Sequence, residues 1–469
     1  MKASPLSIPL TAVLAITVLV PGIGFTQTQR NNETAELRRA IDLLQSGKAD
    51  EAEPLLRHVL ISNPKNADAH NLLGVILDQR GKTAEAEREF RAALRFNPNS
   101  VSAMANLGVL LAHTQRDAEA VRLFESVLRL APDHPQATIN LGLLYASRKE
   151  YERAAQLLIK ANELQPNTFD ILLQLGISLY NLKRLNEAEN ALRTAATIAP
   201  QSSPELFYFF GLIAFTRGQD ETAGELWEKA LSLRPDFPEA NLMLGEVLRK
   251  NKRTQASVEF YRRALEQDPT QFVYYARLGG VYLALGQLDQ AIEVFRRGAL
   301  RFPKLPEAHY FLGIAARAEA DYHLAELELR KSLALGPDNV NALAQLGFVL
   351  LEHDRMPEAE TVLRKAIAIN DQHFYANYDL GRLLLRTQRY EAALPILTHA
   401  AALKPNNPGV HYQLFMALSR LKRKGEADRE LAVFKQLDEA RKSRPRAEVD
   451  TDDDDVQNPS AAPPAQRTP

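Results

Sequence analysis

Apolar residues follow a helical spacing along most of the chain, and the pattern recurs with a fixed period. In the stretch 136–166, for example, Leu141, Leu144 and Tyr145 fall on one face of a helix. Polar and charged residues fill the positions between them. Each period therefore predicts two amphipathic helices separated by a tight turn, and the pattern over about 33–442 predicts an all-α protein.

Small residues mark the period. Glycines recur every 34 residues, with a single step of 35 between Gly176 and Gly211. These lattice glycines are Gly74, Gly108, Gly142, Gly176, Gly211, Gly245, Gly279, Gly313, Gly347 and Gly381. Twelve residues after each stands another small residue, namely Ala86, Ala120, Ala154, Ala188, Ala223, Ser257, Ala291, Ala325, Ala359 or Ala393. Paired small residues predict a close crossing of the two helices, with Gly on one and Ala on the other.

A bulky apolar residue and a proline complete each period. The bulky residue is expected to fill the groove toward the next period. It is Phe90, Phe124, Leu158, Leu192, Trp227, Tyr261, Phe295, Leu329, Leu363 or Leu397. Proline stands 24 residues after the glycine in nine of the ten periods, and Asp371 is the exception. Because proline lacks an amide hydrogen and clashes with the preceding turn, it ends the second helix.

Together these positions resemble the tetratricopeptide-repeat (TPR) family, whose units carry Leu-Gly, Tyr, Ala, Phe and Pro at fixed offsets. The resemblance implies a right-handed superhelical α-solenoid of stacked helix-turn-helix units. Extending the lattice outward adds one divergent unit at each end, with Ala40 and Phe415 at the glycine position, so about twelve units are expected. Such small helix pairs must stack, because none can bury its apolar face alone.

The composition of the chain limits the classes of function that it can have. Lys and Arg total 57 against 58 for Asp and Glu, so no long-range field attracts nucleic acid. The absence of cysteine excludes disulfides and thiolate metal sites. The ten histidines have no metal-binding spacing, and glycines inside helices cannot form a phosphate loop. The sequence therefore predicts a protein that is not an enzyme and has no catalytic residue, metal or cofactor.

The two ends differ from the repeats. Residues 1–26 carry Lys2, an apolar run over 8–20 and then Pro21, which resembles a secretory signal peptide. The chain is expected to be exported, periplasmic or secreted, with retention of this segment as a membrane anchor as the alternative. Residues 443–469 are rich in Pro and Asp and are expected to be disordered. Their aspartate cluster over 450–455 fails the EF-hand pattern and is interpreted as a solvated tail.

In TPR proteins the first helix of each unit lines the concave face, so the resemblance implies a partner-binding groove there. One inner-face position lies two residues before each lattice glycine. The predicted groove residues are Asn106, Asn140, Gln174, Tyr208, Phe209, Met243, Arg277, Tyr310, Phe311, Gln345 and Asp379. The first three resemble the start of the amide ladder in O-linked N-acetylglucosamine transferases, which grips a peptide backbone. The ladder breaks at Phe209, and an ordinary helix surface remains the alternative.

These features predict a protein-protein interaction scaffold that binds a partner protein or an extended peptide. Two alternatives stay open. One is an accessory or substrate-recruiting subunit of an exported or membrane-bound enzyme complex, such as a glycosyltransferase. The other is a membrane-anchored assembly factor that retains the N-terminal segment.

Overall fold

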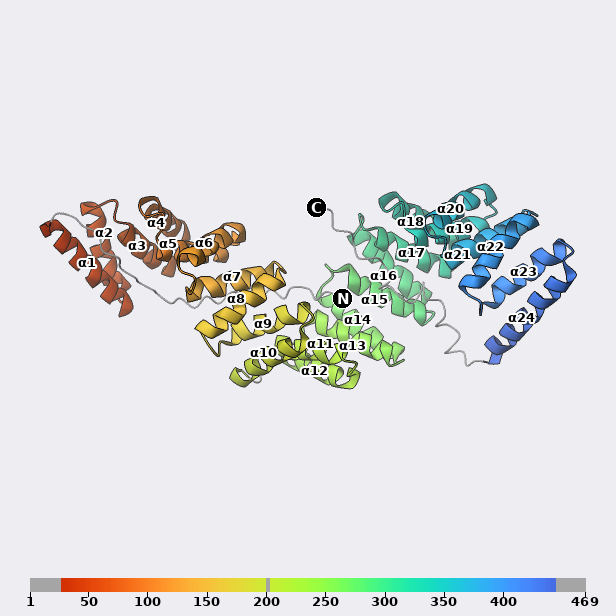
Figure 1. The fold of residues 1–469 in the computed structure, drawn as a ribbon, viewed down its shortest axis with the longest axis horizontal. Helices are drawn as coiled ribbons and strands as arrows, with labels where there is room; N and C mark the ends of the chain where they lie inside the picture. The colour runs from red at the N-terminus through yellow and green to blue at the C-terminus, as the bar shows by residue number, and fades with distance from the viewer. Residues whose placement is uncertain (1–26, 200–202, 444–469) are drawn as a thin grey trace. The chain divides into compact units, whose positions relative to one another are not determined.

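The computed structural model describes residues 27–199 and 203–443, and within these ranges the chain forms 24 helices and no strand. The all-α fold agrees with the prediction. The predicted signal segment 1–26 and nearly all of the predicted tail, 444–469, lie outside the described residues. The helices fall into two compact units, divided between Arg234 and Pro235 (Figure 1).

The first unit holds twelve helices in six consecutive pairs. Their bounds are α1 Gln27–Gln45, α2 Ala49–Ser62, α3 Ala67–Gln79, α4 Thr83–Phe96, α5 Val101–His113, α6 Asp117–Leu130, α7 Pro135–Ser147, α8 Tyr151–Leu164, α9 Phe169–Asn181, α10 Leu185–Ile198, α11 Pro204–Thr216 and α12 Asp220–Leu233.

The second unit repeats the arrangement. Its helices are α13 Pro238–Lys250, α14 Thr254–Gln267, α15 Phe272–Ala284, α16 Leu288–Arg301, α17 Pro306–Ala318, α18 Tyr322–Leu335, α19 Val340–Glu352, α20 Met356–Ile369, α21 Phe374–Arg386, α22 Tyr390–Leu403, α23 Pro408–Arg420 and α24 Lys424–Ser443. A single cluster of buried apolar side chains extends from Leu242 on α13 to Ala417 on α23.

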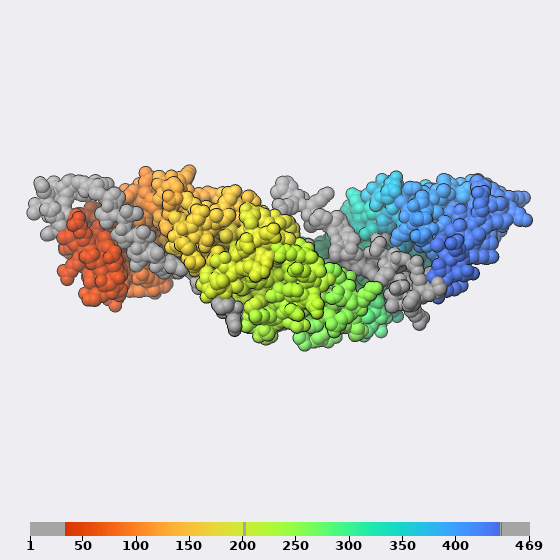
Figure 2. All heavy atoms as spheres, turned by 60° about the horizontal axis from the view of Figure 1, so that its bottom comes forward, coloured from red at the N-terminus to blue at the C-terminus, as the bar shows by residue number. Residues whose placement is uncertain are grey.

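Within each unit the helices form two layers. Each odd-numbered helix packs against the even-numbered helix that follows it, and each even-numbered helix packs against the first helix of the next pair. The odd-numbered helices from α3 to α11, and those from α15 to α23, also contact one another in succession. We call them the first-helix layer and the even-numbered helices the second-helix layer. The colours in Figure 2 follow chain order within each unit, as expected when each pair packs only on its neighbours.

The turn inside every pair has the same backbone geometry. The residue seven positions after the lattice site has a positive φ, as at Gly81 with φ 71° and Gln115 with φ 60°. After α3, the amide of Gly81 donates to the carbonyl of Asp78, and the amide of Lys82 donates to that of Leu77. This is a Schellman motif, which satisfies carbonyl groups left open at a helix end. The tight turn expected from the sequence is therefore a left-handed helix cap.

The lattice glycines lie directly against the bulky residue of their own pair. A β-carbon on Gly211 would stand 2.4 Å from Nε1 of Trp227, and one on Gly279 would stand 2.4 Å from the ring of Phe295. The sequence predicts that the small residue of the second helix meets the glycine and that the bulky residue points toward the next pair. Instead the bulky side chain occupies the space that the missing β-carbon leaves, while Ala223 and its counterparts are buried beside it.

A polar tether links neighbouring pairs. At five junctions, the residue four positions before the lattice site bonds to a carbonyl in the loop that follows the preceding second helix. His309 does so from Nε2 to Pro303 at 3.1 Å, and its Nδ1 lies 2.6 Å from the Glu328 carboxylate. The same carbonyl position is reached by His70, Tyr275, Asn377 and His411. These side chains satisfy acceptors that the end of the second helix leaves without an intrahelical donor.

Two glycine variants within the first unit test the packing contact. In Gly211→Ala the new methyl group meets Trp227, which is fully buried and held by a 3.0 Å bond from Nε1 to the carbonyl of Tyr208. We expect a loss of about 1–3 kcal/mol in the free energy of unfolding, as for other overpacked cores. In Gly142→Ala the nearest atoms of Leu158 are 3.1 Å away. That contact is offset by the gain in helix propensity, about 1 kcal/mol, so stability should barely change. Equal denaturation midpoints for the two variants would contradict the assignment.

A histidine variant tests the polar tether between neighbouring pairs. His309→Ala removes the side chain that donates to the Pro303 carbonyl. It also removes one of the two side chains that contact the buried Glu328 carboxylate, which then keeps only the Lys331 ammonium at 2.7 Å. We expect a loss of about 1–3 kcal/mol in chemical denaturation, the usual cost of leaving a buried polar group unsatisfied. His323→Ala, at an exposed position on the next helix, serves as the control and should cost close to nothing.

Candidate functional site

The exposed side of the first-helix layer is the candidate partner-binding face, and side chains on it reach across from one first helix to the next. In the first unit, Asn106 on α5 donates from Nδ2 to Oδ1 of Asn71 on α3 at 3.0 Å. In the second unit, Arg277 on α15 pairs with Glu246 on α13 at 2.7 Å. The predicted inner-face position thus does lie where neighbouring first helices meet.

The three predicted ladder amides differ in their surroundings. Asn106 is half-buried and engaged with Asn71. Asn140 is buried and donates to the backbone carbonyl of Gln136, one turn earlier on its own helix, at 2.8 Å. Gln174 is half-buried, and its amide has no hydrogen-bond partner among the residues that the structure describes. Of the three, Gln174 offers the most open side chain to a peptide.

The remaining predicted residues lie deeper than an exposed groove position would. Tyr208 and Phe209 are buried and pack edge to face with ring centroids 5.3 Å apart. In the second unit all six predicted residues are 8% exposed or less, namely Met243, Arg277, Tyr310, Phe311, Gln345 and Asp379. Phe311 stacks on the core residue Phe295, with centroids 5.5 Å apart. The apolar members therefore contribute mainly to packing between helices in the unbound chain.

Two buried carboxylates organise the charges of this face. Glu246 accepts a hydrogen bond from the Tyr261 hydroxyl at 3.0 Å and pairs with Arg277. Asp379 pairs with Arg382 at 2.9 Å, and Arg382 also reaches Glu352 on the preceding first helix at 2.8 Å. Burial raises the pKa of Asp379 to about 6, although the nearby guanidinium groups oppose this shift. Both carboxylates hold an arginine in a defined position.

A group of residues that the sequence analysis did not select stands at the surface of the same face. The Arg317 guanidinium lies 5.2 Å from the Phe348 ring centroid, and that of Arg382 lies 5.8 Å from the rings of both Phe348 and Tyr378. All four side chains are half-buried. We call Arg317, Phe348, Tyr378 and Arg382 the arginine–aromatic cluster. It combines three first helices, α17, α19 and α21.

The cluster contains a polar atom that lacks a protein partner. Nε of Arg317 is buried and makes no hydrogen bond to another described residue. Buried donors are almost always satisfied in folded proteins, so this atom is an exception within the cluster. The sequence signal was present, since Phe348 and Arg382 each stand one residue after a lattice glycine. The predicted groove residues stand two or three positions before the lattice glycine and so do not include these positions.

Metal sites and membrane-spanning helices are two further features that the described part of the chain could contain. No group of three or more His, Cys, Asp or Glu residues there is arranged to hold a metal ion. Among the same residues, no helix combines the length and apolar character needed to cross a membrane.

Comparison with family models covers most of the repeat region. The model described as cilia and flagella-associated protein 70 C-terminal domain matches residues 215–450, which is 236 of the 469 residues. The tetratricopeptide-repeat model matches residues 37–101 and 77–135. The model described as anaphase-promoting complex, cyclosome, subunit 3 matches residues 113–195.

Individual proteins show weaker likeness. Human protein O-mannosyl-transferase TMTC3 is 28% identical over 170 residues, which is 35% of this chain and 18% of that protein. The chain thus spans less than a fifth of that relative's length. The structure of the APC/C hetero-tetramer Cut9-Hcn1 covers 84% of this chain and 99% of its own, with 14% identity and a TM-score of 0.43. YrrB, described as a TPR protein with an unusual peptide-binding site, covers 42% of this chain and 97% of its own, with 21% identity and a TM-score of 0.38.

Asp379 makes stability depend on pH. Its pKa rises from 3.8 to about 6 on folding, so the folded chain holds this proton more tightly than the unfolded chain. The resulting stabilisation is complete below pH 4 and is lost as the pH rises through 6. Asp379→Asn removes the titrating group and with it this pH-dependent stabilisation. The free energy of unfolding of the wild type, relative to that of the variant, should therefore fall by about 1–3 kcal/mol from pH 4 to pH 7. Asp338→Asn, at an exposed site, is the control. A pH-independent difference for Asp379→Asn would contradict this prediction.

Proposed function

The chain belongs to the tetratricopeptide-repeat family, through a repeat region that matches the C-terminal domain of cilia and flagella-associated protein 70, and from this premise we propose that it is a non-catalytic scaffold for a partner protein. The partner binds the first-helix face as an extended peptide or a protein surface. All twelve helix pairs count as repeats in this proposal, including the divergent pairs at the two ends.

The arginine–aromatic cluster is the observation that carries the proposal. Arginine and aromatic side chains are the residue types that most often dominate the energy of protein interfaces. Here two arginines flank two half-buried rings, and Asp379 and Glu352 hold Arg382 in place. The cluster is therefore pre-organised, which lowers the entropy lost when a partner binds. The half-buried Arg317 side chain adds a second guanidinium that can pair with a carboxylate of the partner.

In the first unit, the amide of Gln174 supports the same mode of binding. A side-chain amide can donate to and accept from a peptide backbone, whatever the peptide's sequence. Asn106 has one amide hydrogen committed to Asn71, which leaves its Oδ1 and second amide hydrogen for a peptide. Gln174 is thus the main expected contact of the predicted ladder.

Export is part of the proposal. The apolar segment within residues 1–26 resembles a secretory signal, and removal of this segment would place the scaffold in the periplasm or outside the cell. Mass spectrometry of the mature N-terminus tests this point. A mature chain that still begins at Met1 would favour the anchored form instead.

One observation favours a second candidate function. The relative TMTC3 is by name a protein O-mannosyl-transferase, and it is 28% identical to this chain over 170 residues. The repeats would then recruit a protein substrate for a glycosyltransferase on another chain. Co-purification of a transferase with the full chain would support this version, and partners without any transferase would favour the plain scaffold.

Removal of the two rings tests the binding face. In Phe348→Ala/Tyr378→Ala, the amount of partner captured by the immobilised full chain should fall roughly tenfold or more, because buried aromatic anchors often contribute over 1–2 kcal/mol each. Phe260→Ala, on second helix α14, is the matched control, since its ring is also half-buried and should leave capture unchanged. Circular dichroism must first show that both variants fold. If the control weakens capture as much as the double variant does, the partner binds elsewhere.

A further inference from the structure

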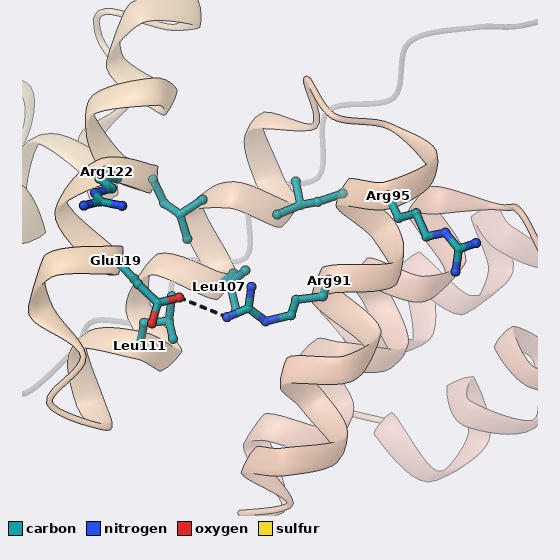
Figure 3. A pocket seen from close by; sticks show the side chains of 8 residues that line it. Arg91, Arg95, Leu107, Leu111, Glu119 and Arg122 are labelled. Carbon is teal, nitrogen blue, oxygen red and sulfur yellow. Dashed lines mark hydrogen bonds and ion pairs between the residues drawn. The ribbon is translucent and has the colours of Figure 1, made fainter.

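A pocket opens in the first unit between the second helices α4 and α6, with first helix α5 as its floor (Figure 3). Its volume is about 440 Å³. Leu107 and Leu111 form a buried floor, while Leu94 and Leu123 form half-buried walls. This is enough space for one large apolar side chain, and it lies at the small end of ligand pockets.

The rim of this pocket is basic. Arg91, Arg95 and Arg122 surround it together with a single acid, Glu119. The Glu119 carboxylate is already shared by Arg91 at 3.1 Å and Arg116 at 2.7 Å. Arg95 and Arg122 are exposed and form no ion pair with any residue that the structure describes. In Figure 3 they lie on either side of the Arg91–Glu119 pair. The rim therefore keeps positive charge on both sides of an apolar floor.

The next helix pair shows how the corresponding space is closed elsewhere. Tyr145 stands three residues after its lattice glycine, as Leu111 does after Gly108. The Tyr145 hydroxyl donates to Glu125 at 2.6 Å, and the Arg153 guanidinium covers the ring at 3.9 Å. The smaller Leu111 and the absence of such a covering arginine leave the first pocket open.

We propose that this pocket is a second docking site, which takes a leucine- or phenylalanine-sized side chain from an acidic peptide segment of a partner protein. The apolar side chain contacts the leucine floor, and carboxylates on both sides of it pair with Arg95 and Arg122. Charge complementarity favours an acidic peptide. The single acid of the rim, Glu119, pairs with Arg91 and Arg116, so Arg95 and Arg122 have no acidic partner there. The rim arginines belong to the second-helix layer, and the site shares no residue with the arginine–aromatic cluster on α17, α19 and α21.

The test uses the full chain and a short fluorescein-labelled peptide with a central leucine flanked on each side by aspartates. We expect saturable binding by fluorescence anisotropy that weakens as salt is added. Arg95→Glu/Arg122→Glu should weaken binding roughly tenfold or more, since two attractions become repulsions. Leu111→Tyr should do the same by filling the pocket, as Tyr145 does. Arg263→Glu/Arg297→Glu makes the same change of charge at exposed sites on α14 and α16 and should have no comparable effect.

Peptide controls address each part of the proposal. Replacement of the central leucine by serine, or of the aspartates by lysines, should abolish binding. Equal binding of either control peptide would overturn the proposal, as would the absence of saturable binding to the wild type. Phe348→Ala/Tyr378→Ala should bind the leucine peptide normally. A loss there, with Arg95→Glu/Arg122→Glu unaffected, would place the peptide on the first-helix face and overturn the pocket while leaving the scaffold proposal intact.

Discussion

The close contact between each lattice glycine and the bulky residue of its own pair sets the geometry on which the rest of the structure depends. A β-carbon would stand within 2.3–3.1 Å of the neighbouring side chain at every lattice position, so the two helices approach only because glycine leaves that space empty. The bulky residue varies from leucine to tryptophan, yet it occupies the same place. With this distance constant, the same turn and the same helix ends can recur along the chain.

Apolar packing alone does not account for the link between one pair and the next. Each second helix ends in backbone carbonyls without intrahelical donors, and the following proline provides an acceptor but no amide hydrogen. At five junctions, histidine, tyrosine or asparagine on the next first helix donates to that acceptor, as His70 does to Pro64. Stacking therefore combines burial of apolar area with satisfaction of polar groups that each pair leaves open. Three of the ten histidines, namely His70, His309 and His411, have this structural role.

The two helix layers present different chemistry to a partner. On the first-helix layer, buried Asp379 and half-buried Glu352 hold Arg382 beside aromatic rings. On the second-helix layer, exposed ion pairs such as Arg330–Glu358 link neighbouring second helices. Exposed pairs contribute little to stability, so this layer tolerates positions where an arginine is left without an acid, as at Arg95 and Arg122. This difference in chemistry supports the proposal of two separate binding surfaces on one scaffold.

The helix pairs, their turns and their ends could be predicted from the sequence, because helical spacing and a 34-residue period are local properties. The position of Asn106 and Arg277 on the inner face was implied by the resemblance to TPR proteins. Exposure at those positions was not, since it depends on side chains from other helices. Phe311 is buried because it stacks on Phe295 of the preceding pair, and Asn140 binds its own backbone. The arginine–aromatic cluster combines residues from three helices that only stacking brings together. The period thus determined the fold, while contacts between pairs decided which side chains a partner can reach.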